Sequence, residues 1–154
     1  MLVIVAPGQG AQTPGFLAPW LEIDAFAEGL ARLSEVTGLD LARLGTGADA
    51  ETIRDTAVAQ PLLMGAGLHA ALVTAPRLGH GLFSLADVAA GHSVGEITAA
   101  AGTGVLDPGQ AAVFIRERGR GMADASAVEP TGMAAVVAGD PDEVLARIEQ
   151  CGLT

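Results

Sequence analysis

The sequence predicts an α/β protein in which short parallel strands alternate with helices. Two apolar runs, residues 2–6 and 88–90, carry this prediction, because each is followed by a glycine-rich turn and then by a segment of helical character. Half of the 154 residues are hydrophobic, which is enough to build a core at this length. We therefore expect one α/β domain, or one domain and part of another.

The first strand is expected at residues 2–6, since an uninterrupted apolar run is typical of a parallel strand that is buried on both faces. A glycine-rich loop follows over residues 8–15, at the end of a strand where open α/β sheets bind ligands. The loop lacks the Gly-Lys-Ser/Thr of a phosphate-binding loop and the third glycine of a dinucleotide fingerprint. A plain turn remains the alternative interpretation.

Helices are expected over residues 16–33 and 60–75, because apolar residues recur at helical spacing in the first segment and Pro61 stands at the start of the second. Residues 39–44 and 49–54 are expected to form short helical turns between them. Residues 83–90 lead into a turn, and residues 97–101 form the next helix. A helix capped by Asp107-Pro108 runs to about residue 125. Residues 131–138 are expected to form a strand and residues 140–150 a helix.

The turn Gly91-His92-Ser93-Val94-Gly95 fits G-x-S-x-G, in which a serine stands on a sharp strand-to-helix turn, the nucleophile elbow. Gly91 and Gly95 have no Cβ, so the strand and the helix can pass closely. The Val94 amide would lie in the first helical turn, where unpaired N–H groups favour the negative charge of an oxyanion formed at Ser93. With 21 glycines a chance match is the alternative, but the flanking strand and helix favour the elbow.

Arg118 is a second candidate functional residue. It falls at helical spacing with Phe114, Ile115 and Met122, so it is expected on the apolar face of its helix. An arginine on a buried face needs an anion, because an unpaired buried charge is costly. Either a structural ion pair with Asp or Glu, or a clamp for a substrate carboxylate, would satisfy it. Arg116 and Arg120 point elsewhere and are expected to be solvated.

Composition excludes several classes of function. The net charge is −10 and every basic residue is Arg, so binding of nucleic acid is not expected. No uninterrupted apolar run of about 18 residues is present, which predicts no membrane span, and the residues before the first strand are too few for a signal peptide. The single cysteine, Cys151, rules out an internal disulfide and fits a cytoplasmic protein. His69, His80 and His92 show no metal-ligand spacing.

Four motifs in order resemble the malonyl-CoA:acyl-carrier-protein transacylases: Gly8-Gln9-Gly10-Ala11-Gln12, Gly91-His92-Ser93-Val94-Gly95-Glu96, Arg118-Gly119-x-x-Met122 and Thr131-Gly132-Met133. The resemblance covers the whole chain. It implies that residues 1–128 form the N-terminal part of an α/β-hydrolase-like acyltransferase core. It also implies that residues 129–154 begin an inserted ferredoxin-like subdomain, of which only the first strand and helix are present.

The resemblance also implies the roles of individual residues. Ser93 matches the nucleophile that carries the malonyl ester, and the backbone amides of Gln9 and Val94 match the oxyanion hole. Arg118 matches the arginine that pairs with the malonyl carboxylate. His92 matches the histidine that precedes the nucleophile in the family, which does not act as the general base. Valine at position 94 is found in malonyl-selective members. Malonyl-CoA would be the substrate and acyl carrier protein the acceptor, in fatty acid or polyketide synthesis, without a metal or bound cofactor.

One departure from the family pattern is that no histidine follows Ser93. In the family, the general-base histidine lies downstream of the inserted subdomain. The chain therefore resembles the N-terminal half of a transacylase, either a truncated form, a proteolytic piece or one chain of a split enzyme. A C-terminal half or a second copy would complete it, and open sheet edges would favour association. The alternatives are a noncatalytic partial subunit, a serine esterase of the α/β-hydrolase class, and an acyltransferase domain of a modular synthase.

Overall fold

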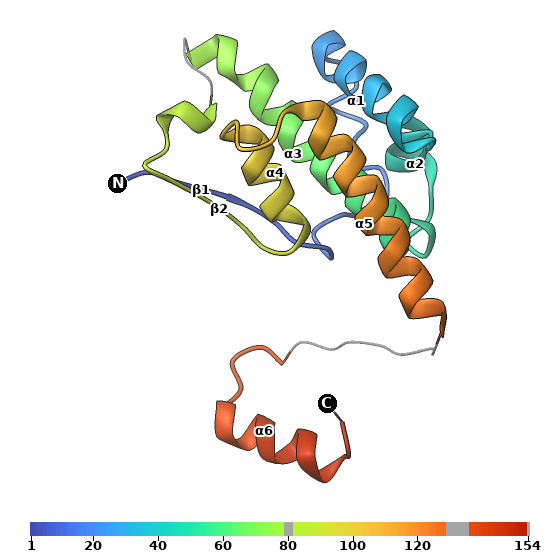
Figure 1. Cartoon of the computed structure of the whole chain (residues 1–154), viewed down its shortest axis with the longest axis vertical. Helices are drawn as coiled ribbons and strands as arrows, with labels where there is room; N and C mark the ends of the chain where they lie inside the picture. Colours follow the sequence, from blue (N-terminus) through green and yellow to red (C-terminus); the bar gives the residue numbers. More distant parts are fainter. Residues whose placement is uncertain (79–81, 129–135, 154) are drawn as a thin grey trace.

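The structure is a computed structural model, and it describes residues 1–78, 82–128 and 136–153. The elements run in the order β1 (Val3–Ala6), α1 (Asp24–Thr37), α2 (Leu41–Gly47), η1 (Thr52–Arg54), α3 (Thr56–Leu78), η2 (Leu82–Leu85), β2 (Val88–Gly91), α4 (Val94–Gly102), α5 (Pro108–Val128) and α6 (Pro141–Gln150). Figure 1 shows the two strands side by side along one side of the helices. The α/β class predicted from the sequence is confirmed.

The sheet of the described residues consists of β1 and β2, which pair in parallel with Val3 opposite Val88 and Ala6 opposite Gly91. Helix α4 packs against both strands, and Ala6 is buried. Val3, Val5 and Val88 are 42%, 73% and 48% exposed. The prediction of a first strand buried on both faces is therefore wrong for the described residues, because their helices cover one face of the sheet.

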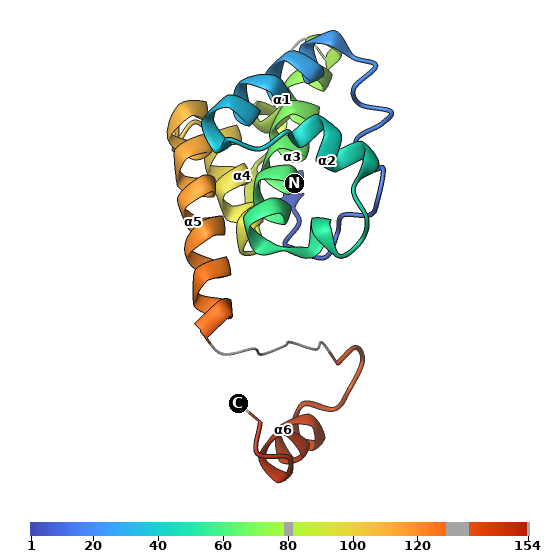
Figure 2. The ribbon, with the colours of Figure 1, turned by 90° about the vertical axis from the view of Figure 1, so that its right-hand side faces the viewer.

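Helix α3 lies at the centre of the helical layer and packs against α1, α4 and α5 (Figures 1 and 2). Two glycines of α3 permit this close packing. A Cβ on Gly67 would stand 2.9 Å from the Thr98 side chain of α4, and a Cβ on Gly65 would stand 2.8 Å from the Leu33 side chain of α1. The core around them is built from fully buried large side chains, which include Leu17, Phe26, Leu30, Leu41, Leu62, Met64 and Ile115.

Helix α1 begins at Asp24 and ends at Thr37, whereas the sequence predicted residues 16–33. The residues before it form turns, since Gly15 has a φ of 78° and Pro19 restricts the backbone before it. Leu17, in these turns, is nevertheless fully buried, which explains why the apolar pattern resembled a longer helix. Gly38, which follows Thr37, ends the helix because it adopts the left-handed conformation with φ 73°.

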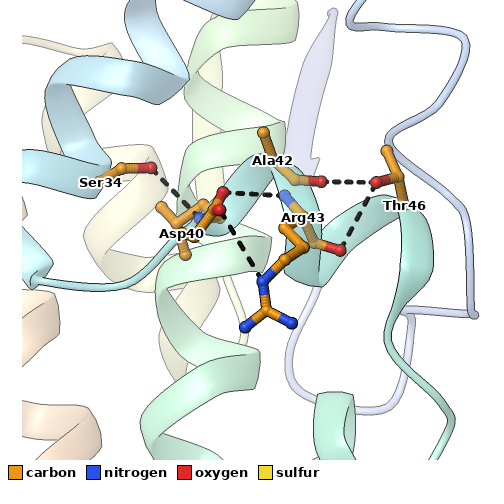
Figure 3. Close-up of polar contacts among 6 residues, drawn as sticks. Ser34, Asp40, Ala42, Arg43 and Thr46 are labelled. Atoms are coloured by element: carbon orange, nitrogen blue, oxygen red, sulfur yellow. Dashed lines mark hydrogen bonds and ion pairs between the residues drawn. The ribbon is translucent and has the colours of Figure 1, made fainter.

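The corner between α1 and α2 is held by side-chain caps (Figure 3). Asp40 accepts a hydrogen bond of 3.0 Å from the Arg43 N–H, and Ser34 Oγ accepts one of 3.2 Å from the Leu41 N–H. Thr46 Oγ1 donates to the Ala42 carbonyl at 2.8 Å. These bonds satisfy backbone groups that a short helix leaves unpaired, so α2 is fixed against α1.

Helix α3 begins at Thr56, before the predicted start at residue 60. The Asp55 carboxylate accepts a 2.7 Å hydrogen bond from the Ala57 N–H, which stabilises an earlier first turn. Pro61 consequently lies in the second turn of α3 rather than at its start. In this second turn, its ring nitrogen has no N–H to donate to the helix.

By length and composition alone, the part of α3 from Thr56 to Thr74 is apolar enough to cross a membrane, with a mean hydropathy of 1.4. The prediction of no span relied on the absence of an uninterrupted apolar run, and Gln60 and His69 interrupt this one. Half of the apolar stretch is buried inside the fold. A buried core helix passes the same test, so the finding is weak evidence for a span, and the packing of α3 fits a core helix.

Two arginines of α5 bind the carboxyl end of α1. Arg116 Nη1 donates to the Val36 carbonyl at 3.1 Å, and Arg120 Nη2 donates to the Thr37 carbonyl at 3.3 Å. Cationic donors at a helix C-terminus satisfy free carbonyls and interact favourably with the helix dipole. The prediction that both side chains are solvated is confirmed for Arg120, which is exposed, whereas Arg116 is half-buried. Each of them also connects α5 to α1.

Residues 131–135 of the strand predicted at residues 131–138 lie outside the described residues. Residues 136–138 are described and are not part of a strand. The predicted final helix is present as α6. The Asp140 side chain caps it by accepting hydrogen bonds from the Asp142 and Glu143 N–H groups. No residue of α6 is buried, and Figures 1 and 2 show it apart from the other helices. The division into residues 1–128 and 129–154 stays a prediction.

Candidate active site

Ser93 lies on the turn between β2 and α4 in a strained backbone conformation, with φ 55° and ψ −111°. Ala138 is the other non-glycine residue with a positive φ in the described part of the chain. Such a conformation costs about 1–3 kcal/mol and persists where the surroundings hold it. The Ser93 N–H donates to Glu96 Oε1 at 3.1 Å, and the His92 N–H donates to the Ala6 carbonyl at 3.1 Å. The turn is thus tied to both the helix and β1.

The two glycines of the turn are required by close backbone contacts. A Cβ on Gly91 would overlap the backbone of Gly95 and Glu96, and a Cβ on Gly95 would overlap the carbonyl of Ala6. Since backbone atoms cannot move aside as a flexible side chain can, both positions exclude larger residues. The close passage of strand and helix that the sequence predicts is confirmed.

The first loop, residues 7–13, lies against this turn. A Cβ on Gly8 would overlap the imidazole ring of His92, so glycine permits the contact. Gln9 Nε2 donates to the Arg54 carbonyl at 2.7 Å, and Gln12 Nε2 donates to the Ile53 carbonyl at 2.9 Å. Two glutamine side chains therefore anchor the loop to η1. The loop and the turn that carries Ser93, called the serine turn below, both line one cleft.

The cleft has a volume of about 670 Å³ and lies beyond the carboxyl ends of β1 and β2. Its lining comes from the first loop, η1, the serine turn and α5, and includes Gln9, Gln12, Ile53, Arg54, His92, Ser93 and Met122. Ligands of open parallel sheets bind at this end of the strands. In the described residues, no hydrogen bond to the Val94 N–H is found, and Val94 is the first residue of α4.

Arg118 contacts Ser93 directly. Its Nη2 donates to Ser93 Oγ at 2.8 Å, and its Nη1 donates to Gln60 Oε1 at 2.5 Å. Among the residues that the structure describes, no carboxylate forms an ion pair with Arg118. Of the two interpretations left open by the sequence, the structural ion pair is therefore not found there, and the guanidinium charge faces the serine.

The predicted face of α5 is only partly correct. Ile115 is fully buried, but Phe114 is 51% exposed and Met122 is 37% exposed, so the buried stripe runs along Ala111, Ala112, Ile115 and Gly119. Arg118 is half-buried at the edge of this stripe. An arginine at the edge of the core keeps its stem covered while its guanidinium reaches Ser93.

Sequence reasoning missed Gln60, which is only 1% exposed and contacts both Arg118 and Met122. A signal was available. Gln60 is a polar residue in a mainly apolar helical run, immediately before Pro61. A buried amide requires hydrogen-bond partners, so a glutamine in such a run indicates a polar group opposite it.

The two histidines that the structure describes do not gather at one site. His92 lines the cleft, His80 lies outside the described residues, and His69 lines a separate apolar cavity of about 200 Å³. Burial and, to a smaller extent, the nearby Arg32 lower the pKa of His69, whereas a hydrogen bond with the Gly29 backbone opposes this shift. Within the described residues, no group of three or more His, Cys, Asp or Glu side chains could hold a metal ion.

The fold and the site together define an α/β protein that presents a strained serine, beside an arginine, at the carboxyl end of a parallel strand pair. Comparison with known proteins makes this class specific. The acyl transferase domain family matches residues 3–152, and the chain belongs to this family.

Individual relatives share half of their length with this chain. The malonyl CoA-acyl carrier protein transacylase of Mycobacterium tuberculosis (strain H37Rv) is 50% identical over 154 residues, which are 99% of this chain and 50% of that protein. The crystal structure of MCAT from Mycobacterium tuberculosis superposes with a TM-score of 0.87, covering 100% of this chain and 50% of that one. The structure of a type II polyketide synthase acyl-carrier protein in complex with its malonyl-transacylase gives a TM-score of 0.80 at 28% identity. This match covers 97% of this chain and 47% of the matched chain. The chain spans about half the length of the curated relatives it matches.

Proposed function

We propose that this chain supplies the nucleophile-bearing half of a malonyl-CoA:acyl-carrier-protein transacylase. The observation that carries the proposal is the 2.8 Å contact between Arg118 Nη2 and Ser93 Oγ. It places an unpaired positive charge at the atom that would carry the acyl group. The 50% identity to mycobacterial malonyl CoA-acyl carrier protein transacylases, over nearly the whole chain, supports the same conclusion.

The proposed reaction is an acyl transfer in two steps. Ser93 Oγ loses its proton to a base and attacks the thioester carbonyl of malonyl-CoA, and CoA leaves as the thiol when it takes up a proton. The phosphopantetheine thiol of acyl carrier protein then attacks the malonyl-serine ester and releases Ser93. No histidine follows Ser93 in this chain, so the base comes from elsewhere in the complete enzyme. The chemistry requires neither a metal nor a bound cofactor.

The backbone amides of Gln9 and Val94 are proposed as the oxyanion hole. Val94 is the first residue of α4, where N–H groups point out of the helix and the dipole favours negative charge. Gln9 belongs to the loop that hydrogen bonds fix against η1, so its amide is held beside the cleft. Each such donor is typically worth a factor of about 10²–10³ in rate.

Arg118 is proposed to select the malonyl group. In a malonyl ester on Ser93, one methylene separates the free carboxylate from the carbonyl carbon. A guanidinium that touches Ser93 Oγ is therefore within reach of that carboxylate. Charge-assisted hydrogen bonds from its planar fork would stabilise malonyl over acetyl, which carries no charge at this position.

The complete core is proposed to be α/β-hydrolase-like and to include a second half that this chain lacks. The partial coverage of its relatives supports this proposal, and so does the exposed apolar face formed by Val3, Val5 and Val88. We further propose that this chain acts in the cytoplasm and that its acceptor is an acyl carrier protein. The solved complex of a malonyl-transacylase with a polyketide synthase carrier protein supports that partner, and fatty acid synthesis fits equally.

Reconstitution tests this function. The chain is co-expressed with the part of the Mycobacterium tuberculosis relative that it does not match, and transfer of labelled malonyl from malonyl-CoA to holo acyl carrier protein is measured. We expect transfer that depends on both pieces. The control is the matching half of the relative with the same second piece. Transfer by the control pair, but not by this chain, would favour the noncatalytic partial subunit, and release of free malonate without a carrier protein would favour an esterase.

A further inference from the structure

Gln60 lies near the start of α3, and its side chain faces the middle of α5. This side chain is almost completely buried, with 1% exposed. Its amide is used at both ends. The oxygen accepts from Arg118 Nη1 at 2.5 Å, and the nitrogen donates to Met122 Sδ at 3.1 Å. Arg118 and Met122 are one helical turn apart, so one amide bridges two successive turns of α5.

The chemistry of these partners fixes the orientation of the amide. A guanidinium has only donors, and a thioether sulfur is only an acceptor. The amide oxygen must therefore face Arg118 and the amide nitrogen must face Met122, since the flipped arrangement would place donor against donor. Because two partners define one orientation, the acceptor for Arg118 Nη1 is preorganised before any substrate enters the cleft.

The amide also leaves the charge of Arg118 uncompensated. Glutamate has nearly the same shape as glutamine, but at position 60 it would form a buried ion pair with Arg118. That pair would compete with a substrate carboxylate for the guanidinium. A neutral acceptor holds one nitrogen in place and preserves the positive charge for the cleft, where Nη2 lies 2.8 Å from Ser93 Oγ.

We propose that Gln60 is a positioning residue that sets malonyl specificity, because it orients Arg118 through a neutral hydrogen bond. The inference rests on the proposed function for its substrate, but the orientation of Arg118 can be measured separately. Two substitutions isolate the two properties of the amide. Gln60→Met keeps the length of the side chain and removes the acceptor, and Gln60→Glu keeps an acceptor and adds a negative charge.

Affinities of the reconstituted enzyme for malonyl-CoA and acetyl-CoA are measured by titration calorimetry. We expect both variants to lower the malonyl-to-acetyl affinity ratio about tenfold, with acetyl-CoA affinity unchanged within about twofold. The matched control is Gln150→Met on α6, which should leave the ratio unchanged. A parallel fall of both affinities in the Gln60 variants would indicate a merely structural role and would overturn the proposal.

A second measurement needs no substrate. Nitrogen-15 NMR measures how fast the Arg118 guanidinium rotates, and the signal of this group is assigned by its loss in Arg118→Lys. We expect faster rotation in Gln60→Met than in the wild-type chain, since one of the two bonds that hold the group is lost. Unchanged rotation would overturn the positioning role. If the wild-type reconstituted enzyme shows no malonyl preference, the proposed function fails, and the rotation measurement alone decides whether Gln60 positions Arg118.

Discussion

Gly95→Ala is expected to lower the free energy of unfolding by about 3 kcal/mol, which corresponds to a fall in Tm of about 6–12 °C for a chain of this size. The new methyl group would overlap the Ala6 carbonyl oxygen and stand 2.7 Å from the Pro7 carbonyl oxygen. Both obstacles are backbone atoms of the segment that leaves β1. Relief of the overlap therefore requires α4 to move away from the strand, which also displaces Ser93.

Gly121→Ala is the matched control for this prediction. Gly121 lies in α5, and a Cβ there would meet nothing within 4 Å. Alanine is the better helix former, so this variant is expected to be more stable by about 0.5–1 kcal/mol. Thermal unfolding followed by circular dichroism compares the two variants with the wild-type chain. A Gly95→Ala variant as stable as wild type would mean that strand and helix do not approach as closely as the structure shows.

Arg118→Ala is expected to lower malonyl transfer by the reconstituted enzyme about 100-fold while acetyl transfer changes by less than about threefold. The reason is that the guanidinium is the cationic group at Ser93, and a malonyl carboxylate would lose its charge-assisted hydrogen bonds. Arg118→Lys should recover only part of the loss, because an ammonium keeps the charge without the planar fork. Rates with malonyl-CoA and acetyl-CoA are compared under identical conditions.

Arg116→Ala provides the control for Arg118. Arg116 is on the same helix, but its guanidinium donates to the Val36 carbonyl of α1, whereas that of Arg118 donates to Ser93. Its loss should lower stability slightly and leave the ratio of malonyl to acetyl transfer unchanged. If Arg118→Ala slowed both acyl groups equally, the arginine would serve the structure of the turn or the reaction in general, and its role in selecting malonyl would be refuted.

The parts of the fold that could be predicted are those determined by local patterns. The apolar runs before Pro7 and Gly91 gave the two strands, and the Asp107-Pro108 and Asp140-Pro141 pairs gave two helix starts. The glycines of the serine turn were interpreted correctly, because only a missing Cβ allows such an approach. Ser93 and Arg118, two of the proposed site residues, are brought together in one contact.

Other features depend on contacts that a local pattern does not contain. The turns that precede α1 bury Leu17 and therefore look like a helical stripe, although Gly15 and Pro19 prevent a helix. The face of the sheet that remains exposed could not be anticipated, since an apolar run is the same whether one layer or two cover it. Gln60 acquires its importance only when α3 packs against α5.

The most direct test of the account is the intact mass of the reconstituted enzyme after incubation with malonyl-CoA and no carrier protein. Without an acceptor, the acyl-enzyme should accumulate. The account predicts one malonyl group on this chain, mapped to the peptide that contains Ser93, and none on the Ser93→Ala variant. An adduct of equal yield on Ser93→Ala, or no adduct on a wild-type complex that binds malonyl-CoA, would contradict the assignment of Ser93 as the residue that carries the malonyl group.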